Sequence, residues 1–182
     1  MLLNSNRANI GMKAHDFSLL NVNNKFYTLK NIRKKNGFVV AFICNHCPYV
    51  KDMISRLVSD FNYLLSIDVG VLTIMPNDYL SYPEDSFENM KNFSKINSFS
   101  FPYLIDSDQI IAKKYDATCT PDFFCFDKKD KLFYRGRLDN VKYKSKYEKR
   151  ERCLISAYLK IIENNSIVIN QKHSIGCSIK WK

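Results

Sequence analysis

The stretch CNHCPYV, residues 44–50, holds the side chains whose types and spacing are best suited to chemistry. Cys44 and Cys47 stand three positions apart, with Asn45 and His46 between them. Two cysteines at this spacing can form a redox-active disulfide, supply part of a metal site, or pack as ordinary core thiols. The elements around the pair decide which of these alternatives the sequence favours.

The sequence on either side of the cysteine pair predicts a strand, a helix and a second strand. Residues 38–43, FVVAFI, form an apolar run with β-branched members, which is typical of a strand buried on both faces of a sheet. Pro48 suits the first turn of a helix, where a missing N–H costs nothing. Apolar residues then recur at helical spacing, at Ile54, Leu57, Val58, Phe61, Leu64 and Leu65. A further apolar run at 69–75 completes a βαβ unit, in which the two strands are parallel.

The remaining segments predict a mixed α/β sheet. The other expected elements are an N-terminal hairpin (16–20 and 26–29), a helix that begins near Asp85 or Ser86, a short helix (108–115), two antiparallel strands (122–127 and 132–138) and a helix (149–163). A βαβ unit followed by a ββα unit describes a thioredoxin-like fold, with a central mixed sheet flanked by helices and an N-terminal β-hairpin extension. We take residues 1–182 as a single domain of this type, in which 164–182 is a C-terminal tail without a clear period.

The junction between the first buried strand and the helix is where a cysteine acquires reactivity. A helix N-terminus carries partial positive charge and unpaired N–H groups, which stabilise a thiolate, whereas free cysteine has a pKa of about 8.5. We therefore expect Cys44 to be the exposed attacking cysteine, Cys47 to resolve, and His46 to lower the pKa of Cys44 further. A metal site would need more ligands than these three residues supply, and no second ligand pair stands at zinc spacing, so we expect no metal and no other cofactor.

Far downstream, a threonine and a proline precede the strand expected at 122–127. In thioredoxin-like folds a cis-proline opens the strand that faces the disulfide, and the backbone of the preceding residue can pair with an extended substrate segment. We accordingly predict a cis bond before Pro121 and an open backbone edge at Thr120. The residues assigned as support for the cysteine pair are Asn45, His46, Pro48, Thr120 and Pro121.

Several longer stretches strengthen this interpretation. They are AHDFSLL, FICNHCPYVK, YPEDSFENM, FPYLIDSDQIIAKKYDATCTPDFFCFD, LFYRGRLD and SIGCSIKW, and they extend over nearly the whole chain. In these stretches the chain resembles the peroxiredoxin-like branch of the thioredoxin superfamily, the redoxin or AhpC/TSA-type proteins. The resemblance implies a thioredoxin fold with an N-terminal extension and thiol-dependent redox chemistry.

The chain departs from two common patterns of this superfamily. Typical peroxiredoxins have Thr-x-x-Cys, so the resemblance implies a peroxidatic role for Cys47, with Cys44 in the place of the threonine and acting as the resolving thiol. Arg135 or Arg137 would then hold the peroxide. Typical thioredoxins have Trp before the first cysteine and an acid in the preceding strand, whereas this chain has Ile43 and no acid in FVVAFI.

Four further cysteines bring the total to six. Cys119, just before Pro121, and Cys177, in the tail, are candidates for additional redox thiols, with ordinary packing as the alternative for each. Cys125 and Cys153 are expected in the core. An even count can indicate a disulfide framework, but a chain of 182 residues with 46% hydrophobic residues can bury a core without one.

Much of the formal charge of +10 falls in residues 128–160, and a basic tract can bind nucleic acid or anionic lipid. No nucleic-acid motif accompanies it, so we expect a solvated surface, no nucleic-acid partner and no membrane. No apolar run approaches the about 18 residues of a membrane span, and the N-terminus lacks a signal-peptide pattern. The expected compartment is therefore the cytoplasm, where cysteines stay reduced unless they are catalytic.

Three functions remain open at this point. The first is a thiol–disulfide oxidoreductase in which Cys44 attacks and Cys47 resolves. The second is a thiol peroxidase in which Cys47 passes through a sulfenic acid and Cys44 resolves. The third is a non-enzymatic module that binds a metal or a partner. The expected partners are a disulfide-containing protein or a small peroxide as substrate and a thiol as electron donor.

Overall fold

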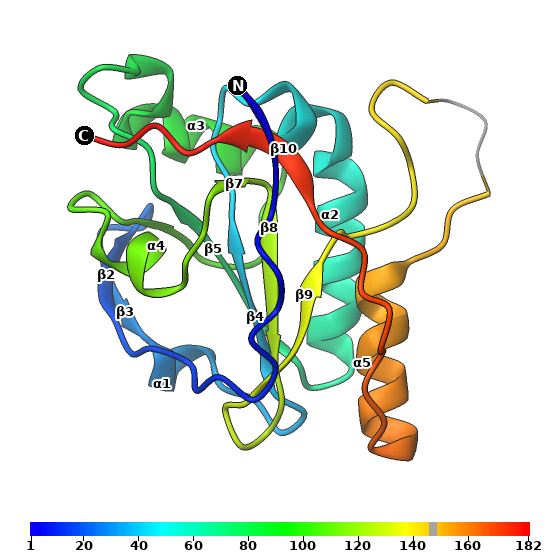
Figure 1. Cartoon of the computed structure of the whole chain (residues 1–182). Coiled ribbons are helices and arrows are strands. Elements are labelled where there is room, and N and C mark those ends of the chain that lie inside the picture. The colour runs from blue at the N-terminus through cyan, green and yellow to red at the C-terminus, as the bar shows by residue number, and fades with distance from the viewer. Residues whose placement is uncertain (146–148) are drawn as a thin grey trace.

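A seven-stranded mixed sheet forms the centre of the computed structural model, which describes residues 1–145 and 149–182 (Figure 1). Its strands are β2 (Ser18–Asn21), β3 (Phe26–Thr28), β4 (Phe38–Phe42), β5 (Gly70–Met75), β6 (Tyr103–Ile105), β8 (Asp122–Phe126) and β9 (Leu132–Gly136). The strand order is β3-β2-β6-β5-β4-β8-β9. Strands β4, β5 and β6 are parallel, and all other pairings in this sheet are antiparallel.

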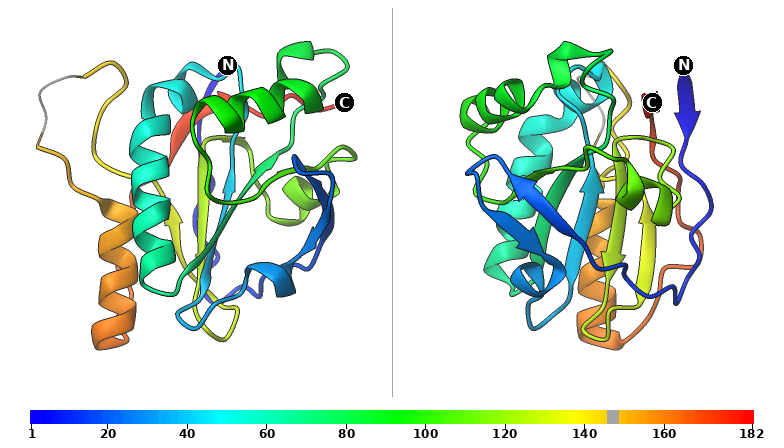
Figure 2. Two further views of the ribbon diagram at one scale, coloured as in Figure 1. Left: turned by 180° about the vertical axis from the view of Figure 1, so that it is seen from behind. Right: turned by 90° about the vertical axis from the view of Figure 1, so that its left-hand side faces the viewer.

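Helices cover both faces of this sheet. They are α1 (Leu29–Ile32), α2 (Pro48–Ser66), α3 (Phe87–Ile96), α4 (Ile110–Lys114) and α5 (Cys153–Asn164), and a 3₁₀ turn (Pro83–Asp85) precedes α3. Helices α2, α3 and α5 lie on one face, and α1 and α4 lie on the other (Figures 1 and 2). Successive residues of β4 point to opposite faces, so Val39 packs with the first group and Val40 with the second. This is the α/β architecture expected from the sequence.

The sequence around the cysteine pair folds locally as predicted. Strand β4 is buried along its whole length and ends two residues before the first cysteine. Helix α2 begins at Pro48, with Cys47 as its N-cap, and it buries Leu57, Phe61 and Leu64 from the predicted apolar stripe. Strand β5 then pairs with β4 in parallel. The βαβ unit therefore holds the cysteines between the carboxyl end of a buried strand and the amino end of a helix.

Other predicted elements are present with different bounds. The hairpin of β2 and β3 forms, and β2 also pairs with β6, so the hairpin continues the main sheet. Helices α4 and α5 start later than the predicted ranges 108–115 and 149–163. Ser86 is the N-cap of α3, where its side chain accepts the N–H of Asn89, while the carboxylate of Asp85 binds elsewhere.

A second, three-stranded sheet brings the two ends of the chain together. Its strands are β1 (Leu2–Asn4), β10 (Ile175–Ser178) and β7 (Cys119–Thr120), in the order β1-β10-β7. Both pairings are antiparallel, and Figure 1 shows β10 beside β1 at the end of the molecule where β7 lies. The tail 164–182 shows no period in the sequence, so β10 was not expected. It forms by pairing with two strands that lie far away in the chain, so its own sequence does not predict it.

Part of the basic tract is neutralised within the fold. Arg150 and Arg152 pair with the buried Asp60 at 2.7 and 2.8 Å, and Arg150 also pairs with Asp139 at 2.8 Å. Residues 146–148 of the tract lie outside the described residues. In the part of the chain that the structure describes, no helix has the length and apolar character needed to cross a bilayer.

Candidate active site

Both cysteines of the pair contact the same residue, Thr120. The Sγ atom of Cys47 donates to the carbonyl oxygen of Thr120 at 3.2 Å, and the Sγ atom of Cys44 lies 3.3 Å from the Thr120 hydroxyl. The peptide bond between Thr120 and Pro121 is cis, which confirms the prediction. Both cysteines are free thiols with 0% exposure. The prediction of an exposed Cys44 is wrong, because Thr120 and the turn that carries Asp85 enclose it.

The helix N-terminus favours the thiolate of Cys47 over that of Cys44. A hydrogen bond from Cys44 and a backbone N–H in the first turn of α2 outweigh the effect of burial and lower the pKa of Cys47 to about 5. The same bond to Cys47, with burial and the nearby charge of Asp85, raises the pKa of Cys44 well above the range of a free thiol. From the sequence we expected the thiolate at Cys44, stabilised by His46. The difference arises because α2 starts at Pro48, which makes Cys47 the N-cap.

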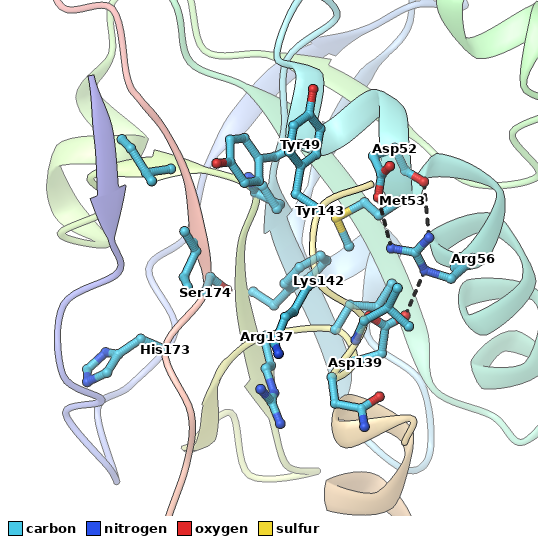
Figure 3. Close-up of a pocket in the computed structure, with 17 residues that line it drawn as sticks. Tyr49, Asp52, Met53, Arg56, Arg137, Asp139, Lys142, Tyr143, His173 and Ser174 are labelled. Carbon is cyan, nitrogen blue, oxygen red and sulfur yellow. Dashed lines mark hydrogen bonds and ion pairs between the residues drawn. The ribbon is translucent and has the colours of Figure 1, made fainter. Parts of the chain in front are cut away.

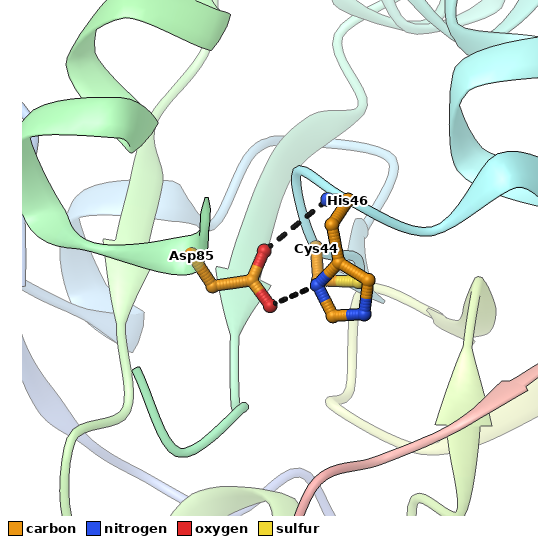
Figure 4. Close-up of side chains that lie close together, drawn as sticks. All are labelled: Cys44, His46 and Asp85. Carbon is orange, nitrogen blue, oxygen red and sulfur yellow. Dashed lines mark hydrogen bonds and ion pairs between the residues drawn. The ribbon is translucent and has the colours of Figure 1, made fainter. Parts of the chain in front are cut away.

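A buried carboxylate, Asp85, organises the loop between the cysteines. Its Oδ1 accepts the backbone N–H groups of Asn45 at 2.8 Å and His46 at 3.3 Å, and its Oδ2 accepts the amide of Asn77 at 2.7 Å. Oδ2 also lies 2.6 Å from Nδ1 of His46 (Figure 4). This bond raises the pKa of His46. Burial raises the pKa of Asp85, but the bonds from His46 and Asn77 outweigh it and lower that pKa below its ordinary value.

The same loop is fixed from its other sides by Asn45 and His46, two of the residues assigned as support. The Asn45 side chain accepts the hydroxyl of Tyr103 at 2.9 Å and donates to the carbonyl of Glu84 at 3.0 Å. The ring of His46 stacks on Tyr82, with centroids 5.8 Å apart and planes 12° from parallel. The orientation of the imidazole is therefore set by a carboxylate on one side and an aromatic ring on the other.

Three residues of this network were missed in the sequence: Asp85, Asn77 and Tyr103. Asn77 follows β5, whose carboxyl end lies beside that of β4. Polar residues at the carboxyl ends of neighbouring parallel strands often lie in a binding site, so this position could have indicated Asn77 from the sequence. Asp85 was considered only as a helix cap. Its role depends on partners 40, 39 and 8 positions away in the chain.

Cys44, His46 and Asp85 lie close enough to be considered as metal ligands. One candidate ligand atom from each lies within 4.8 Å of the others (Figure 4). Both oxygens of Asp85, however, already accept hydrogen bonds, and Nδ1 of His46 is one of the groups that they bind. A cation at this point would have to displace these contacts, so the arrangement is better suited to orient His46 and keep it protonated.

Cys177 on β10 adds a third thiol to the site. It stands opposite Thr120 in the pairing of β10 with β7. Its thiol and its backbone N–H both form hydrogen bonds with the sulfur of Cys47. Burial and the bond to Cys47 raise the pKa of Cys177 to about 11. The prediction of an open backbone edge at Thr120 is wrong, because β10 occupies that edge, and the redox role of Cys177 stays a prediction.

The other candidates have different surroundings. Cys119 is buried, its Sγ lies 3.6 Å from a backbone carbonyl, and burial raises its pKa, so it keeps its proton and its redox role also stays a prediction. Arg135 pairs with the buried Asp122 at 2.8 Å. The Nε atom of Arg137 lies 3.4 Å from the sulfur of Cys153. Both arginines considered for peroxide binding therefore have partners other than the cysteine pair.

A pocket of about 390 Å³ adjoins Pro121 (Figure 3). The first turns of α2, the loop after β9 and strands β1 and β10 line it. Among its lining residues the ring of Tyr49 stacks on that of Tyr143, with centroids 4.5 Å apart, and Arg56 is held by an ion pair with Asp139 at 2.9 Å. The pocket gives the cis-proline loop a neighbouring cavity with aromatic and charged walls.

Comparison with known proteins identifies the family. The model of the AhpC/TSA family matches residues 10–135. The crystal structure of an uncharacterized conserved protein from Geobacillus kaustophilus is 39% identical and covers 100% of this chain and 97% of that chain, with a TM-score of 0.95. A hypothetical protein from Sinorhizobium meliloti 1021 is 32% identical, with 98% of each chain covered and a TM-score of 0.93.

More distant structures share the fold. A peroxidoxin from Mycobacterium tuberculosis is 13% identical and covers 76% of this chain and 88% of that chain, with a TM-score of 0.58. A search of the curated proteins gives no match. The family match, the solved relatives and the thiols at a strand-to-helix junction agree with one another. The chain therefore belongs to the AhpC/TSA family, in the redoxin branch of the thioredoxin superfamily.

Proposed function

We propose that this protein is a thiol–disulfide oxidoreductase whose redox centre is the Cys44/Cys47 pair. Membership of the AhpC/TSA family supports thiol-based redox chemistry in general. The observation that carries the specific proposal is the environment of Cys47, which is the N-cap of α2 and has a pKa lowered to about 5 by Cys44 and the helix N-terminus. At neutral pH this sulfur is a thiolate, the form that attacks a disulfide.

In this proposal Cys47 attacks first, the reverse of the order first expected from the sequence. Its thiolate attacks one sulfur of a substrate disulfide R–S–S–R′, which forms a Cys47–S–S–R mixed disulfide and releases R′–S⁻. Cys44 then attacks the sulfur of Cys47, which forms the Cys44–Cys47 disulfide and releases R–S⁻. The proton lost by Cys44 passes to R–S⁻, and R′–S⁻ is protonated by water. The substrate gains two electrons and the protein loses two.

His46 and Asp85 act as positioning residues. The positive charge of His46 favours the thiolate and the negative charge that spreads over the sulfurs during exchange. Asp85 maintains that charge because its bond raises the pKa of His46. Through its bonds to the backbone of Asn45 and His46 it also fixes the loop that joins the two cysteines.

The proposal is tested by mixing reduced protein with oxidised glutathione and mapping the products by mass spectrometry. The unsubstituted chain should end with a Cys44–Cys47 disulfide. Cys47→Ser should abolish the reaction at the pair, and Cys44→Ser should leave glutathione attached to Cys47 in the first product. Cys125→Ser, in the core, is the matched control and should react like the unsubstituted chain. Unchanged disulfide reduction by Cys47→Ser would overturn the proposal.

A thiol peroxidase is the second candidate, because Cys47 stands at the position that the family resemblance makes peroxidatic and has a lowered pKa. Its thiolate would attack a peroxide ROOH to give Cys47–SOH and ROH, and Cys44 would condense with the sulfenic acid and release water. Arg135, which would hold the peroxide, is instead paired with Asp122. Peroxide and disulfide consumption measured at equal thiol concentration separate the two functions.

A third alternative is a non-enzymatic module that binds a metal or a partner. Elemental analysis of protein purified without added metal tests the metal version, and stoichiometric zinc or copper would replace the redox proposal. The cytoplasm is the proposed compartment, and cell fractionation tests it. The proposed partners are a disulfide-containing protein or small peroxide and a thiol electron donor.

A further inference from the structure

The backbone of β10 lies in very close contact with the cis-proline loop. A Cβ atom placed on Gly176 would lie 2.0 Å from the carbonyl oxygen of Thr120 and 2.9 Å from Cδ of Pro121. Cβ atoms essentially never approach other atoms to less than 3.0 Å, so the pairing of β10 with β7 requires glycine at this position. The close approach brings the next residue, Cys177, opposite Thr120.

Buried amides hold the tail beyond β10 in place. The N–H of Lys180 donates to Oδ1 of Asn77 at 2.9 Å, and the carbonyl of Lys180 accepts Nε2 of Gln109 at 2.8 Å. Asn77 and Gln109 are 1% and 0% exposed. Asn77 also donates to Asp85 at 2.7 Å, so a single amide joins the tail to the carboxylate that organises the thiol loop.

The site consequently brings three cysteines together at Thr120. The Sγ atom of Cys47 lies 3.2 Å from the carbonyl oxygen of Thr120, and Cys177 is the residue paired with Thr120 across the strands. Paired antiparallel residues have Cα atoms only about 4.5–5.5 Å apart. Hydrogen bonds from Cys44 and from Cys177 both lower the pKa of Cys47. An extended substrate would have to pair with the same edge that β10 covers.

We propose that Cys177 is a third redox-active thiol, which occupies the place of a substrate cysteine and forms a disulfide with Cys47 during turnover. The inference rests on the proposed function of the Cys44/Cys47 pair. Strand β10 leaves the edge of Thr120 to admit an external disulfide, and its return brings Cys177 back to the sulfur of Cys47.

The steps balance in atoms and electrons. After Cys47 has formed the mixed disulfide Cys47–S–S–R, Cys177 loses its proton and attacks the sulfur of Cys47. The bond to R breaks, R–S⁻ takes up the proton, and the Cys47–Cys177 disulfide forms. Cys44 then loses its proton and attacks the same sulfur, which forms the Cys44–Cys47 disulfide and returns the proton to the Cys177 thiolate. The only oxidant is the substrate disulfide.

The test uses the full chain without the final resolving thiol. Reduced Cys44→Ser protein is treated with oxidised glutathione, and intact mass and peptide mapping follow the products over time. The glutathione on Cys47 should be lost as a Cys47–Cys177 disulfide forms. Cys44→Ser/Cys177→Ser should keep glutathione on Cys47. Cys44→Ser/Cys119→Ser is the matched control, because Cys119 is the other cysteine of this small sheet, and it should behave like Cys44→Ser. Cys44→Ala replaces Cys44→Ser if serine disturbs folding.

The outcomes separate this inference from the proposed function. If Cys44→Ser and Cys44→Ser/Cys177→Ser keep glutathione on Cys47 equally long, Cys177 is not redox-active, while the attack by Cys47 still stands. If Cys47 reacts with glutathione in none of the variants and forms no disulfide, both the proposed function and the role of Cys177 are wrong.

Discussion

The Sγ atom of Cys47 lies 3.2 Å from the carbonyl oxygen of Thr120, although 73 positions separate the two residues in the sequence. A thiol donates to this carbonyl, but a thiolate cannot. When Cys47 ionises it therefore loses its hydrogen bond to the Thr120 carbonyl. The thiolate instead accepts hydrogen bonds from Cys44, from Cys177 and from the first turn of α2. Thr120 therefore contacts both the sulfur that ionises and the strand β10 that pairs with it.

The ionisation of Cys47 should be visible in a pH titration. The ultraviolet absorbance of the reduced protein should show one cysteine that ionises at a pH of about 5, far below the about 8.5 of free cysteine. Cys44→Ala should shift this ionisation to higher pH, because it removes the hydrogen bond that contributes most to the lowered pKa. Cys125→Ala serves as the control. An unchanged midpoint in Cys44→Ala would show that Cys44 does not stabilise the thiolate.

Asp85→Asn should lower the free energy of unfolding by about 1–3 kcal/mol, because it removes the charged partner of His46. The pKa of His46 is raised in the folded state. The stability that the ion pair contributes is therefore complete below a pH of about 6.5, the pKa of free histidine, and it is lost as the pH rises through the raised pKa. The pKa of Asp85 is lowered, so the contribution is also lost as the pH falls through that lowered value.

The difference between Asp85→Asn and the unsubstituted chain should therefore be largest in the mildly acidic range. Urea unfolding at a series of pH values measures it. Glu88→Gln, on the exposed side of α3, is the matched control. A difference that does not change with pH would contradict the ion pair between Asp85 and His46.

Gly176→Val should detach β10 from the cis-proline loop, because a side chain there has no room. We expect a loss of roughly 1–3 kcal/mol in stability from the overpacking and a faster alkylation of Cys47 by iodoacetamide. Thermal unfolding and timed alkylation with peptide mapping measure the two effects. Ile175→Val, at a neighbouring position that is 50% exposed, is the control. If both variants are alkylated at the same rate, β10 does not screen Cys47.

Arg135→Met should destabilise the protein by about 3–5 kcal/mol, because it leaves the buried charge of Asp122 without its partner. Asp122→Asn/Arg135→Met should recover part of this loss. Among the molecules that remain folded, the reaction of Cys47 with disulfides and with peroxides should be unchanged. A selective loss of the peroxide reaction would instead assign Arg135 to peroxide binding and favour the peroxidase.

The elements that hold the cysteine pair could be predicted because each depends on neighbours in the sequence. Strand β4 is a continuous apolar run, and the stripe of α2 at Leu57, Phe61 and Leu64 follows from helical spacing alone. The cis bond at Pro121 followed from the order of these elements. The ionisation of the pair was harder to predict, because it depends on Cys47 being the N-cap of α2 and on its hydrogen bonds in the folded chain.

The rest of the site depends on contacts between distant segments. Strand β10 has only four residues, and its end residue Ile175 is exposed. Its sequence therefore shows no alternation of apolar and polar residues that would indicate a strand. Asp85 looked like a helix cap, and only the folded chain brings it to Asn45 and Asn77. Pairing and burial of this kind are properties of the tertiary structure, which one sequence does not reveal.

The short sheet of β1, β10 and β7 has a practical consequence for anyone who labels this protein. The carbonyl of Met1 accepts the N–H of Ser178 at 2.9 Å, and Leu2 stands opposite Cys177. An affinity tag or fluorescent protein fused to either end would begin within a few residues of the strand that covers Cys47. Thiol reactivity should accordingly be measured after the tag has been removed, with the tagged form run in parallel.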